Sequence, residues 1–170
     1  MIHLVTGGAR SGKSTFAQGQ AEAVPGALVF VATARVRDDE IADRVRRHRA
    51  DRGPRWSTVE APEDLTAALV APNAAGVLVD CLTMWVANLV LAELPDDVVT
   101  ARIAALETAC RGATTPTWIV TNEVGLGIVP DNLLSRRYRD HLGRCNQAIA
   151  GVAARVTLMV CGIPVPVKGV

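Results

Sequence analysis

The chain has 170 residues, of which 49% are apolar and 21% charged, and its formal net charge is +1. This length fits a single domain spanning residues 1–170, and the apolar fraction is sufficient for a packed core, which excludes a disordered chain. The near-zero charge excludes a protein that binds nucleic acid or an anionic membrane surface through a general basic excess.

Cysteine usage and hydropathy indicate the compartment. The four cysteines form no C-x-x-C pair, which excludes a zinc knuckle and a thioredoxin-like motif. Residues 1–6 are too short an apolar run for a signal peptide and carry no basic segment. The longest apolar stretch, residues 74–92, is interrupted by Asp80 and is predicted to be a buried strand followed by a buried helix. We therefore expect a cytoplasmic protein with reduced thiols and no membrane insertion.

Strand and helix patterns alternate along the whole chain. In chain order they predict a strand at 2–6, a helix at 14–24, a strand at 27–32, helices at 39–51 and 63–70, a strand at 76–79, helices at 82–94 and 98–111, a strand at 117–121, a loop at 122–130, a helix at 132–154 and a strand at 156–160. Residues 162–170 contain Pro164 and Pro166 and are predicted to be irregular. This alternation predicts an α/β fold of three layers with a mostly parallel central sheet, and ligands at the carboxyl ends of its strands.

A phosphate-binding motif follows the first predicted strand. The pattern G-x-x-x-x-G-K-[ST] is matched at every fixed position by Gly7-Gly8-Ala9-Arg10-Ser11-Gly12-Lys13-Ser14. Its glycines let backbone N–H groups curl around phosphate oxygens, and the next helix points its positive end at them. Lys13 is predicted to reach the β and γ phosphates of a nucleotide, and Ser14 to ligate Mg²⁺. The motif and the alternating elements together predict a P-loop NTPase-like fold.

A second Mg²⁺ anchor is predicted at Asp80, which closes the apolar strand at 76–79. The alternative is that Asp80 caps the helix that follows, and the two roles are compatible. Sequence features of a GTP-dependent switch are absent, since neither Asp80-Cys81-Leu82-Thr83 nor Thr121-Asn122-Glu123-Val124 fits the motifs of such proteins. A small-molecule kinase or transferase is favoured instead.

Half of the sixteen arginines lie between residues 35 and 55, around His48. Most of this segment fits a solvated helix with ion pairs along it. On a helix, Ile41, Val45 and His48 share one face, so the imidazole points toward the protein. Two interpretations of His48 are open at this point. It is either a packed core residue or a nucleophile that attacks a phosphorus atom while neighbouring guanidinium groups neutralise the developing charge.

Several segments resemble one family over nearly the whole chain, the bifunctional adenosylcobinamide kinase / adenosylcobinamide-phosphate guanylyltransferases of cobalamin biosynthesis. The resemblance is carried by the motif at 6–14, by Asp39-Glu40, Arg44 and His48, and by segments 32–34, 56–60, 80–83, 88–89, 121–130, 139–147 and 162–164. It implies that the γ-phosphate of ATP or GTP moves to a hydroxyl of adenosylcobinamide. It also implies that GMP from GTP is then transferred to the new phosphate through a GMP–histidine intermediate.

Residue roles carry over from this resemblance by position. His48 matches the guanylylated histidine, whereas His3 and His141 do not compete for that role. Nucleotide contacts are implied for residues 7–14 and for Thr33, Ala34, Arg35, Arg49, Ala50, Asp51, Arg52 and Glu60. The resemblance leaves Asp80 as either a metal ligand or a base for the cobinamide hydroxyl.

Other features of the resemblance leave alternatives open. Asn122 and Glu123 fit either acid/base or corrin contacts or a tight structural connector, and Arg139, Asp140 and Asn146 fit either a functional site or a salt-bridge network. The family is homotrimeric, which we expect here. The alternative function is a P-loop kinase for another small molecule, without guanylyl transfer.

Overall fold

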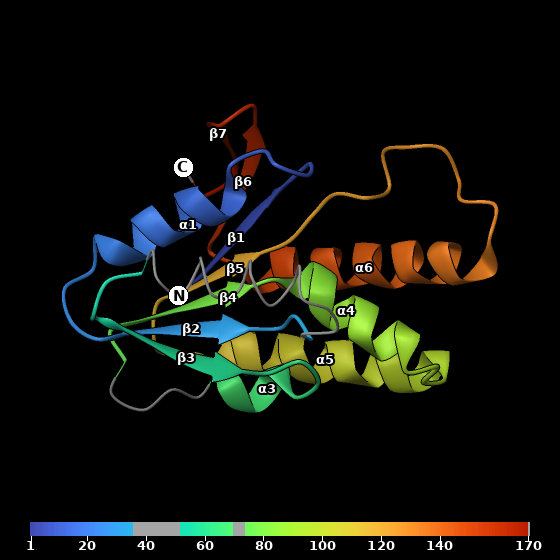
Figure 1. Ribbon diagram of the computed structural model, residues 1–170, viewed down its shortest axis with the longest axis horizontal. Helices are drawn as coiled ribbons and strands as arrows, with labels where there is room; N and C mark the ends of the chain where they lie inside the picture. Colours follow the sequence, from blue (N-terminus) through green and yellow to red (C-terminus); the bar gives the residue numbers. More distant parts are fainter. Residues whose placement is uncertain (36–51, 70–73, 170) are drawn as a thin grey trace.

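The computed structural model describes residues 1–35, 52–69 and 74–169. These residues contain one seven-stranded sheet in the order β3-β2-β4-β5-β1-β6-β7 (Figure 1). Every neighbouring pair is parallel except β6 and β7. The strands are β1 (Ile2–Gly7), β2 (Leu28–Ala32), β3 (Trp56–Glu60), β4 (Gly76–Asp80), β5 (Thr117–Val120), β6 (Arg155–Val160) and β7 (Ile163–Lys168). The α/β fold with a mostly parallel sheet is therefore confirmed.

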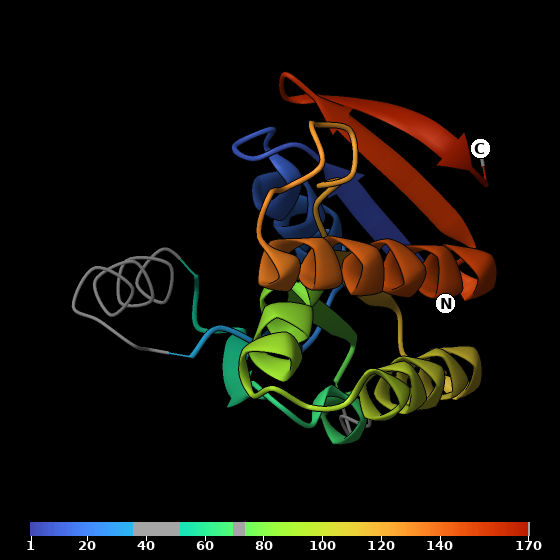
Figure 2. The same ribbon diagram turned by 90° about the vertical axis from the view of Figure 1, so that its right-hand side faces the viewer.

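Helices pack on both faces of this sheet, as the three-layer prediction requires. The helices of the described residues are α1 (Lys13–Glu22), α3 (Leu65–Ala68), α4 (Leu82–Leu91), α5 (Asp96–Gly112) and α6 (Leu133–Val152). Helix α1 packs on β5, β4 and β1, whereas α4, α5 and α6 pack together on the opposite face (Figure 2). No helix in the described ranges is long and apolar enough to cross a membrane.

The central strands are buried on both faces, as expected for parallel strands covered by helices. In β1, Leu4 belongs to the core beneath α4, α5 and α6, whereas its neighbour Val5 packs in the smaller core beneath α1. The same alternation separates Val79 from Leu78 in β4. Because both faces are apolar, only the carboxyl edge of the sheet is left for polar chemistry.

Two edge strands depart from the sequence prediction. The segment Trp56–Glu60 was not predicted as a strand, and it forms the half-exposed edge strand β3, parallel to β2. The prediction of an irregular tail is wrong for Ile163–Lys168, because these residues form β7, which pairs antiparallel to β6. Both strands lie at the rim of the sheet, where a continuous apolar pattern is not needed.

The position of β7 explains why its prolines are tolerated. Val160 and Ile163 pair across a two-residue loop in which Cys161 and Gly162 both have positive φ, 51° and 83°. A loop of this kind makes the pair next to it hydrogen-bonded, and such pairs alternate with non-hydrogen-bonded ones. Pro164 and Pro166 therefore fall at non-hydrogen-bonded positions, where their missing N–H groups would have pointed away from β6.

Candidate active site

The motif after β1 forms a tight loop in which two glycines are sterically required. A Cβ on Gly7 would lie 2.5 Å from the carbonyl oxygen of Met159, on the neighbouring strand β6. Gly12 has a φ of 90°, in the left-handed region that favours glycine. The loop thus presses its backbone against β6 and then turns directly into α1.

The start of α1 is suited to an anion. Gly12 is its N-cap residue and supplies no side-chain hydrogen bond to the first turn. The N–H groups of that turn therefore lack the side-chain acceptor that usually caps them, and phosphate oxygens fit in its place. A cavity of about 270 Å³ lies against this turn, and its lining is Arg10, Ser11, Gly12, Lys13, Ser14 and Thr15.

Lys13 folds back over the loop and is only 7% exposed. Its ammonium group donates a hydrogen bond to the carbonyl oxygen of Gly8 and lies 3.4 Å from the hydroxyl of Ser11. Burial lowers the pKa of Lys13, while electrostatic interactions with Cys81 and Asp80 act in the opposite direction. A buried cation held at the loop is the group that a nucleotide's phosphates would attract.

Asp80 lies at the carboxyl end of β4 and faces α1. Asp80 and Ser14 line one cavity of about 360 Å³, together with Phe30 and Leu78 on the strands and four further residues of α1. Ser14 also lines the phosphate-sized cavity, so the two spaces meet at this residue. The alternative role of Asp80 as the helix cap is not borne out, because α4 begins at Leu82 and its N-cap residue is Cys81.

The pair Ser14 and Asp80 fits a Mg²⁺ ion bound together with a nucleotide. Magnesium in such sites takes one or two protein oxygens and completes its shell with phosphate oxygens and water. The described residues contain no cluster of three or more His, Cys, Asp or Glu side chains that would hold a metal without a nucleotide. These residues therefore fit an ion that arrives with the triphosphate and neutralises its charge.

Thr33 follows β2 and is fully buried. Its hydroxyl donates to the carbonyl oxygen of Cys81 at 2.7 Å and accepts from the N–H of Cys81 at 2.8 Å. The buried amide of Asn88 donates to the carbonyl oxygen of Thr33 at 2.8 Å. The Thr33 side chain is thus occupied by the turn after Asp80, and it shapes the site rather than offering a free hydroxyl to a nucleotide.

Among the described residues, Glu60 lies at the same sheet edge as Asp80. Ala32 pairs with Asp80 on one side and with Glu60 on the other, so both acids lie at the carboxyl ends of their strands. Arg35 forms an ion pair with Glu63. The Arg52 guanidinium carbon lies 3.4 Å from the ring centroid of Phe30, which lines the Asp80 cavity.

Glu123 follows β5 and lies beside the start of the phosphate loop. Its N–H donates to the carbonyl oxygen of Gly7 at 3.3 Å. Its carboxylate oxygen Oε1 accepts a hydrogen bond from the Thr6 hydroxyl at 2.9 Å and lies 3.4 Å from the amide nitrogen of Asn146 on α6. This arrangement brings a carboxylate next to the first glycine of the phosphate loop.

Comparison with known proteins identifies the chain's relatives. The model of the family described as cobinamide kinase / cobinamide phosphate guanyltransferase matches residues 3–167. The chain belongs to this family. It is 45% identical to the bifunctional adenosylcobalamin biosynthesis protein CobP of Pseudomonas aeruginosa, over 99% of this chain and 98% of the relative. It is 40% and 39% identical to the proteins named CobU of Escherichia coli and Salmonella typhimurium, over 99% of this chain and 100% of each.

Several predicted residues of the cobinamide kinase / guanyltransferase site lie outside the described residues. These are His48, Arg49, Ala50 and Asp51. The other two histidines are held in structural contacts. His3 pairs with Thr157 at 2.8 Å, and burial together with the charge of Arg155 lowers its pKa. His141 is 1% exposed and pairs with Asp96 at 2.8 Å.

Sequence reasoning missed the polar residues that hold the loop after β5. Neither Thr6 nor Thr83 had an assigned role, and the Thr83 hydroxyl accepts from the N–H of Asn122 at 3.1 Å. Asn146 was left open between a functional site and a salt-bridge network, and it forms hydrogen bonds with Thr121 and Asn122. The signal that could have found Thr6 is its place directly before the phosphate loop.

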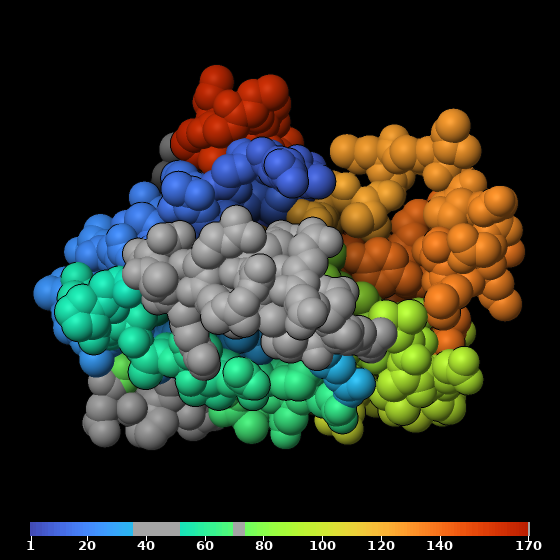
Figure 3. Space-filling view, viewed as in Figure 1, coloured from blue at the N-terminus to red at the C-terminus, as the bar shows by residue number. Residues whose placement is uncertain are grey.

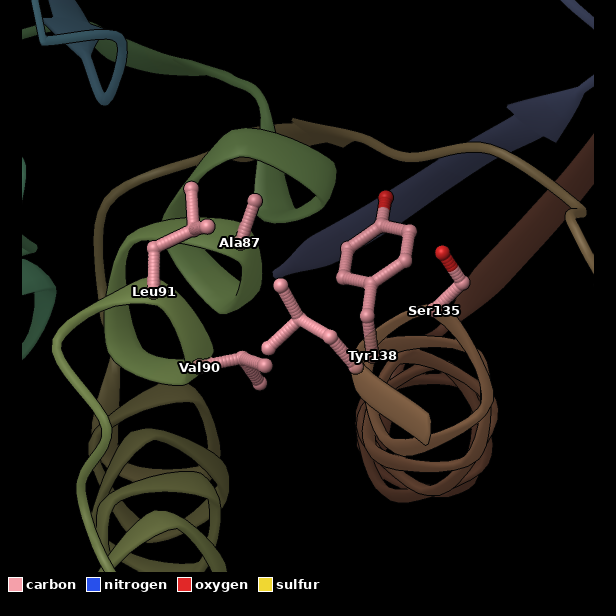
Figure 4. Close-up of a pocket in the computed structure, with 6 residues that line it drawn as sticks. Ala87, Val90, Leu91, Ser135 and Tyr138 are labelled. Atoms are coloured by element: carbon pink, nitrogen blue, oxygen red, sulfur yellow. The ribbon is translucent and has the colours of Figure 1, made fainter. Parts of the chain in front are cut away.

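A separate apolar cavity of about 180 Å³ lies between α4 and α6 (Figure 4). Ala87, Val90 and Leu91 line it from α4, and Ser135 and Tyr138 from α6. Burial raises the pKa of Tyr138 to about 12, so its hydroxyl stays protonated at neutral pH. None of the residues that bear the predicted chemistry lines this space, which sets it apart from the nucleotide site.

Proposed function

We propose that this protein phosphorylates adenosylcobinamide with ATP or GTP and then transfers GMP from GTP to the product, giving adenosylcobinamide-GDP for cobalamin biosynthesis. One observation supports this most strongly: the buried Lys13, the uncapped start of α1 and the Ser14–Asp80 pair meet at one sheet edge. They do so in a chain that belongs, over almost its whole length, to the cobinamide kinase / guanyltransferase family.

In the first reaction the loop Gly7–Ser14 holds the triphosphate. Lys13 and the first turn of α1 neutralise the charge that develops on the γ-phosphate, and Ser14 and Asp80 hold Mg²⁺ on its oxygens. The aminopropanol hydroxyl of adenosylcobinamide attacks the γ-phosphorus, the bond to the bridging oxygen breaks, and the nucleoside diphosphate leaves. Asn122 and Glu123 contribute an acid/base or corrin contact from the loop after β5.

In the second reaction His48 is the nucleophile. An imidazole nitrogen attacks the α-phosphorus of GTP and pyrophosphate leaves. The phosphate of adenosylcobinamide phosphate then attacks the same phosphorus and frees the imidazole. The nucleotide contacts are formed by Thr33, Ala34, Arg35, Arg49, Ala50, Asp51, Arg52 and Glu60. Thr33 acts through the turn at Cys81. Two observations support this assignment: Glu60 lies at the strand edge that carries Asp80, and Arg52 stacks on Phe30, which lines the Asp80 cavity.

We also propose a cytoplasmic homotrimer that takes no nucleic-acid partner. The resemblance to a homotrimeric family supports it. The trimer is also supported by exposed apolar side chains of the loop after β5, in which Leu126 is 88% exposed and Ile128 is 98% exposed. Apolar groups gathered on a surface in this way commonly mark a subunit contact.

His48→Ala tests the guanylyl half of this proposal. Incubation with GTP labelled on the α-phosphate should give a base-stable, acid-labile label on the wild type and none on the variant. Phosphorylation of adenosylcobinamide should continue in His48→Ala, since the first reaction does not use the imidazole. His141→Ala serves as the control and should keep the label.

The alternative is a P-loop kinase that acts on another small molecule without guanylyl transfer. It predicts γ-phosphate transfer or hydrolysis with no label from the α-phosphate. Wild-type protein that turns over γ-phosphate yet takes up no label would exclude the GMP–histidine step. Wild-type protein that transfers no γ-phosphate to adenosylcobinamide would exclude the kinase half.

A further inference from the structure

The loop after β5 leaves the sheet next to the residues of the candidate active site. Strand β5 lies between β1, which leads into the phosphate loop, and β4, which ends in Asp80. Val120 pairs with Val5 on one side and with Asp80 on the other. The next residues therefore emerge at the edge between the loop that holds the phosphates and the carboxylate assigned to the metal.

Backbone hydrogen bonds hold this loop on both sides. The N–H of Asn122 donates to the hydroxyl of Thr83 on α4 at 3.1 Å, and the N–H of Glu123 donates to the carbonyl oxygen of Gly7 at 3.3 Å. These contacts fix the backbone of Glu123 relative to the first residue of the phosphate loop. The Glu123 carboxylate is therefore carried by a segment whose backbone is held in place by hydrogen bonds.

The Glu123 carboxylate is held by one oxygen only. Oε1 accepts from the Thr6 hydroxyl and from the Asn146 amide. Asn146 is itself fixed, because its Oδ1 accepts from Thr121 at 2.7 Å and its Nδ2 donates to the carbonyl oxygen of Asn122 at 3.0 Å. Within the described chain, Oε2 takes part in no hydrogen bond. The clamp thus orients the carboxylate and leaves the second oxygen as an acceptor.

We propose that Glu123 is the general base of the kinase reaction, and that Thr6 and Asn146 are positioning residues that aim its Oε2 at the acceptor hydroxyl. This inference rests on the proposed function and gives Asp80 and Glu123 different roles. Asp80 shares a cavity with Ser14 and is assigned to the metal, which leaves its oxygens occupied during the reaction. Glu123 approaches from β5, next to the first glycine of the phosphate loop.

In this step the phosphoryl group and the proton each pass to a defined acceptor. The cobinamide hydroxyl oxygen forms a bond to the γ-phosphorus, and the bond from that phosphorus to the β–γ bridging oxygen breaks. The hydroxyl proton passes to Oε2 of Glu123, and the nucleoside diphosphate leaves with the bridging oxygen. Glu123 returns the proton to solvent before the next turnover. Guanylylation of His48 has no acceptor hydroxyl, so this base takes no part in it.

Glu123→Gln tests the base directly. The amide oxygen still accepts from Thr6, but the side chain no longer takes a proton. The kcat of adenosylcobinamide phosphorylation should fall roughly 10²- to 10⁴-fold, the range of general-base contributions, with the KM values little changed. Labelling of His48 by α-labelled GTP should persist. Glu107→Gln on the exposed face of α5 is the matched control and should keep full activity.

Thr6 variants test the positioning. Thr6→Val removes the hydroxyl at nearly constant volume and should lower kcat more than it changes KM, whereas Thr6→Ser keeps the donor and should restore most of the rate. Thr108→Val, on α5, is the control for the effect of replacing a threonine by a valine. Asn146→Ala should lower kcat in the same direction, with His48 labelling confirming that the nucleotide site is intact.

The outcomes separate this inference from the proposed function. Wild-type kinase activity together with an unchanged kcat in Glu123→Gln overturns the base assignment alone. A raised KM for adenosylcobinamide with unchanged kcat also overturns it, because it shows a binding contact. Equal loss in Thr6→Val and Thr6→Ser overturns the positioning role. Wild-type protein without transfer to adenosylcobinamide defeats the proposed function itself.

Discussion

Thr33 determines where the turn after Asp80 lies. Its hydroxyl satisfies both the N–H and the carbonyl oxygen of Cys81, so one side chain replaces two backbone partners at the end of β4. The buried amide of Asn88 on α4 donates to the carbonyl oxygens of Thr33 and Pro62, and so ties both segments to that helix. The carboxylate assigned to Mg²⁺ is thus placed by residues that need not touch a nucleotide.

Thr33→Val should destabilise the protein and reduce its activity. The N–H of Cys81 loses its partner, at a cost on the order of 1–3 kcal/mol for a buried group left unsatisfied, whereas the Cys81 carbonyl oxygen still accepts from the N–H of Trp85. Thr33→Ser keeps the hydroxyl and should retain most of the stability. Urea denaturation of both variants measures the difference in the free energy of unfolding. A Thr33→Val variant as stable as the wild-type protein would contradict the role of the Thr33 hydroxyl in holding the turn at Cys81.

Residues of the site differ in how far the sequence predicts them. The phosphate loop and Asp80 were predictable because their chemistry is local: a glycine pattern after a strand, and an acid at the end of another. The contacts of Glu123 were not, because its partners Thr6 and Asn146 lie 117 and 23 residues away. Such pairs are fixed by strand order, which single-sequence patterns do not give.

At the scale of elements, Asp96 joins two helices. It lies in the first turn of α5 and bonds with His141 and Arg137, both on α6. Hydrogen bonds with His141 and with Arg137 lower the pKa of the Asp96 carboxyl. The ionised form is therefore favoured in the folded state, and its stabilising effect is present above the unfolded pKa and lost as the pH falls through the folded value.

Asp96→Asn should lower the melting temperature at neutral pH. The difference from wild type should shrink as the pH falls from the ordinary carboxyl pKa of about 4 through the lower pKa of the folded state, where the wild-type carboxyl becomes protonated too. Thermal melts between neutral and acidic pH measure this, with Asp97→Asn, the next residue, as the control. A difference that stays constant with pH would contradict the role of the charge.

The described helices and the central strands were predicted well because their apolar pattern is continuous, whereas the helix predicted at 39–51 lies outside the described residues. The edge strands were not: β3 mixes Trp56 and Val59 with polar residues, and β7 contains Pro164 and Pro166. A proline normally argues against a strand, but only where its N–H would have been used. Which positions face outward depends on the register with β6, which appears only in the folded chain.

On the scale of the whole molecule, the loop 122–132 stands out from the body above α6 (Figure 3). Its Leu126 and Ile128 are almost fully exposed, and Leu133 at the start of α6 is 71% exposed. Two such side chains, exposed close together on a projecting loop, fit the subunit contact proposed above. The loop also begins beside Glu123, so an adjoining subunit would lie close to the proposed base.

The double variant Leu126→Asp with Ile128→Asp should weaken a trimer. Burying two carboxylates in an apolar contact is unfavourable, so the mass measured by light scattering should fall toward that of the monomer. Leu91→Asp, at an exposed position of α4, provides a control for added charge elsewhere. A double variant whose mass equals that of wild type would show that the loop is outside the interface.

The prolines of β7 have a consequence for how the protein behaves at high concentration. A free sheet edge recruits further strands through alternating donors and acceptors, and this is how many β-rich proteins aggregate. At Pro164 and Pro166 the outer edge of β7 carries carbonyl oxygens without donors. The exposed valines of this strand are therefore carried on a backbone that is poorly suited to fibril growth, and the sheet can end there without a protecting helix.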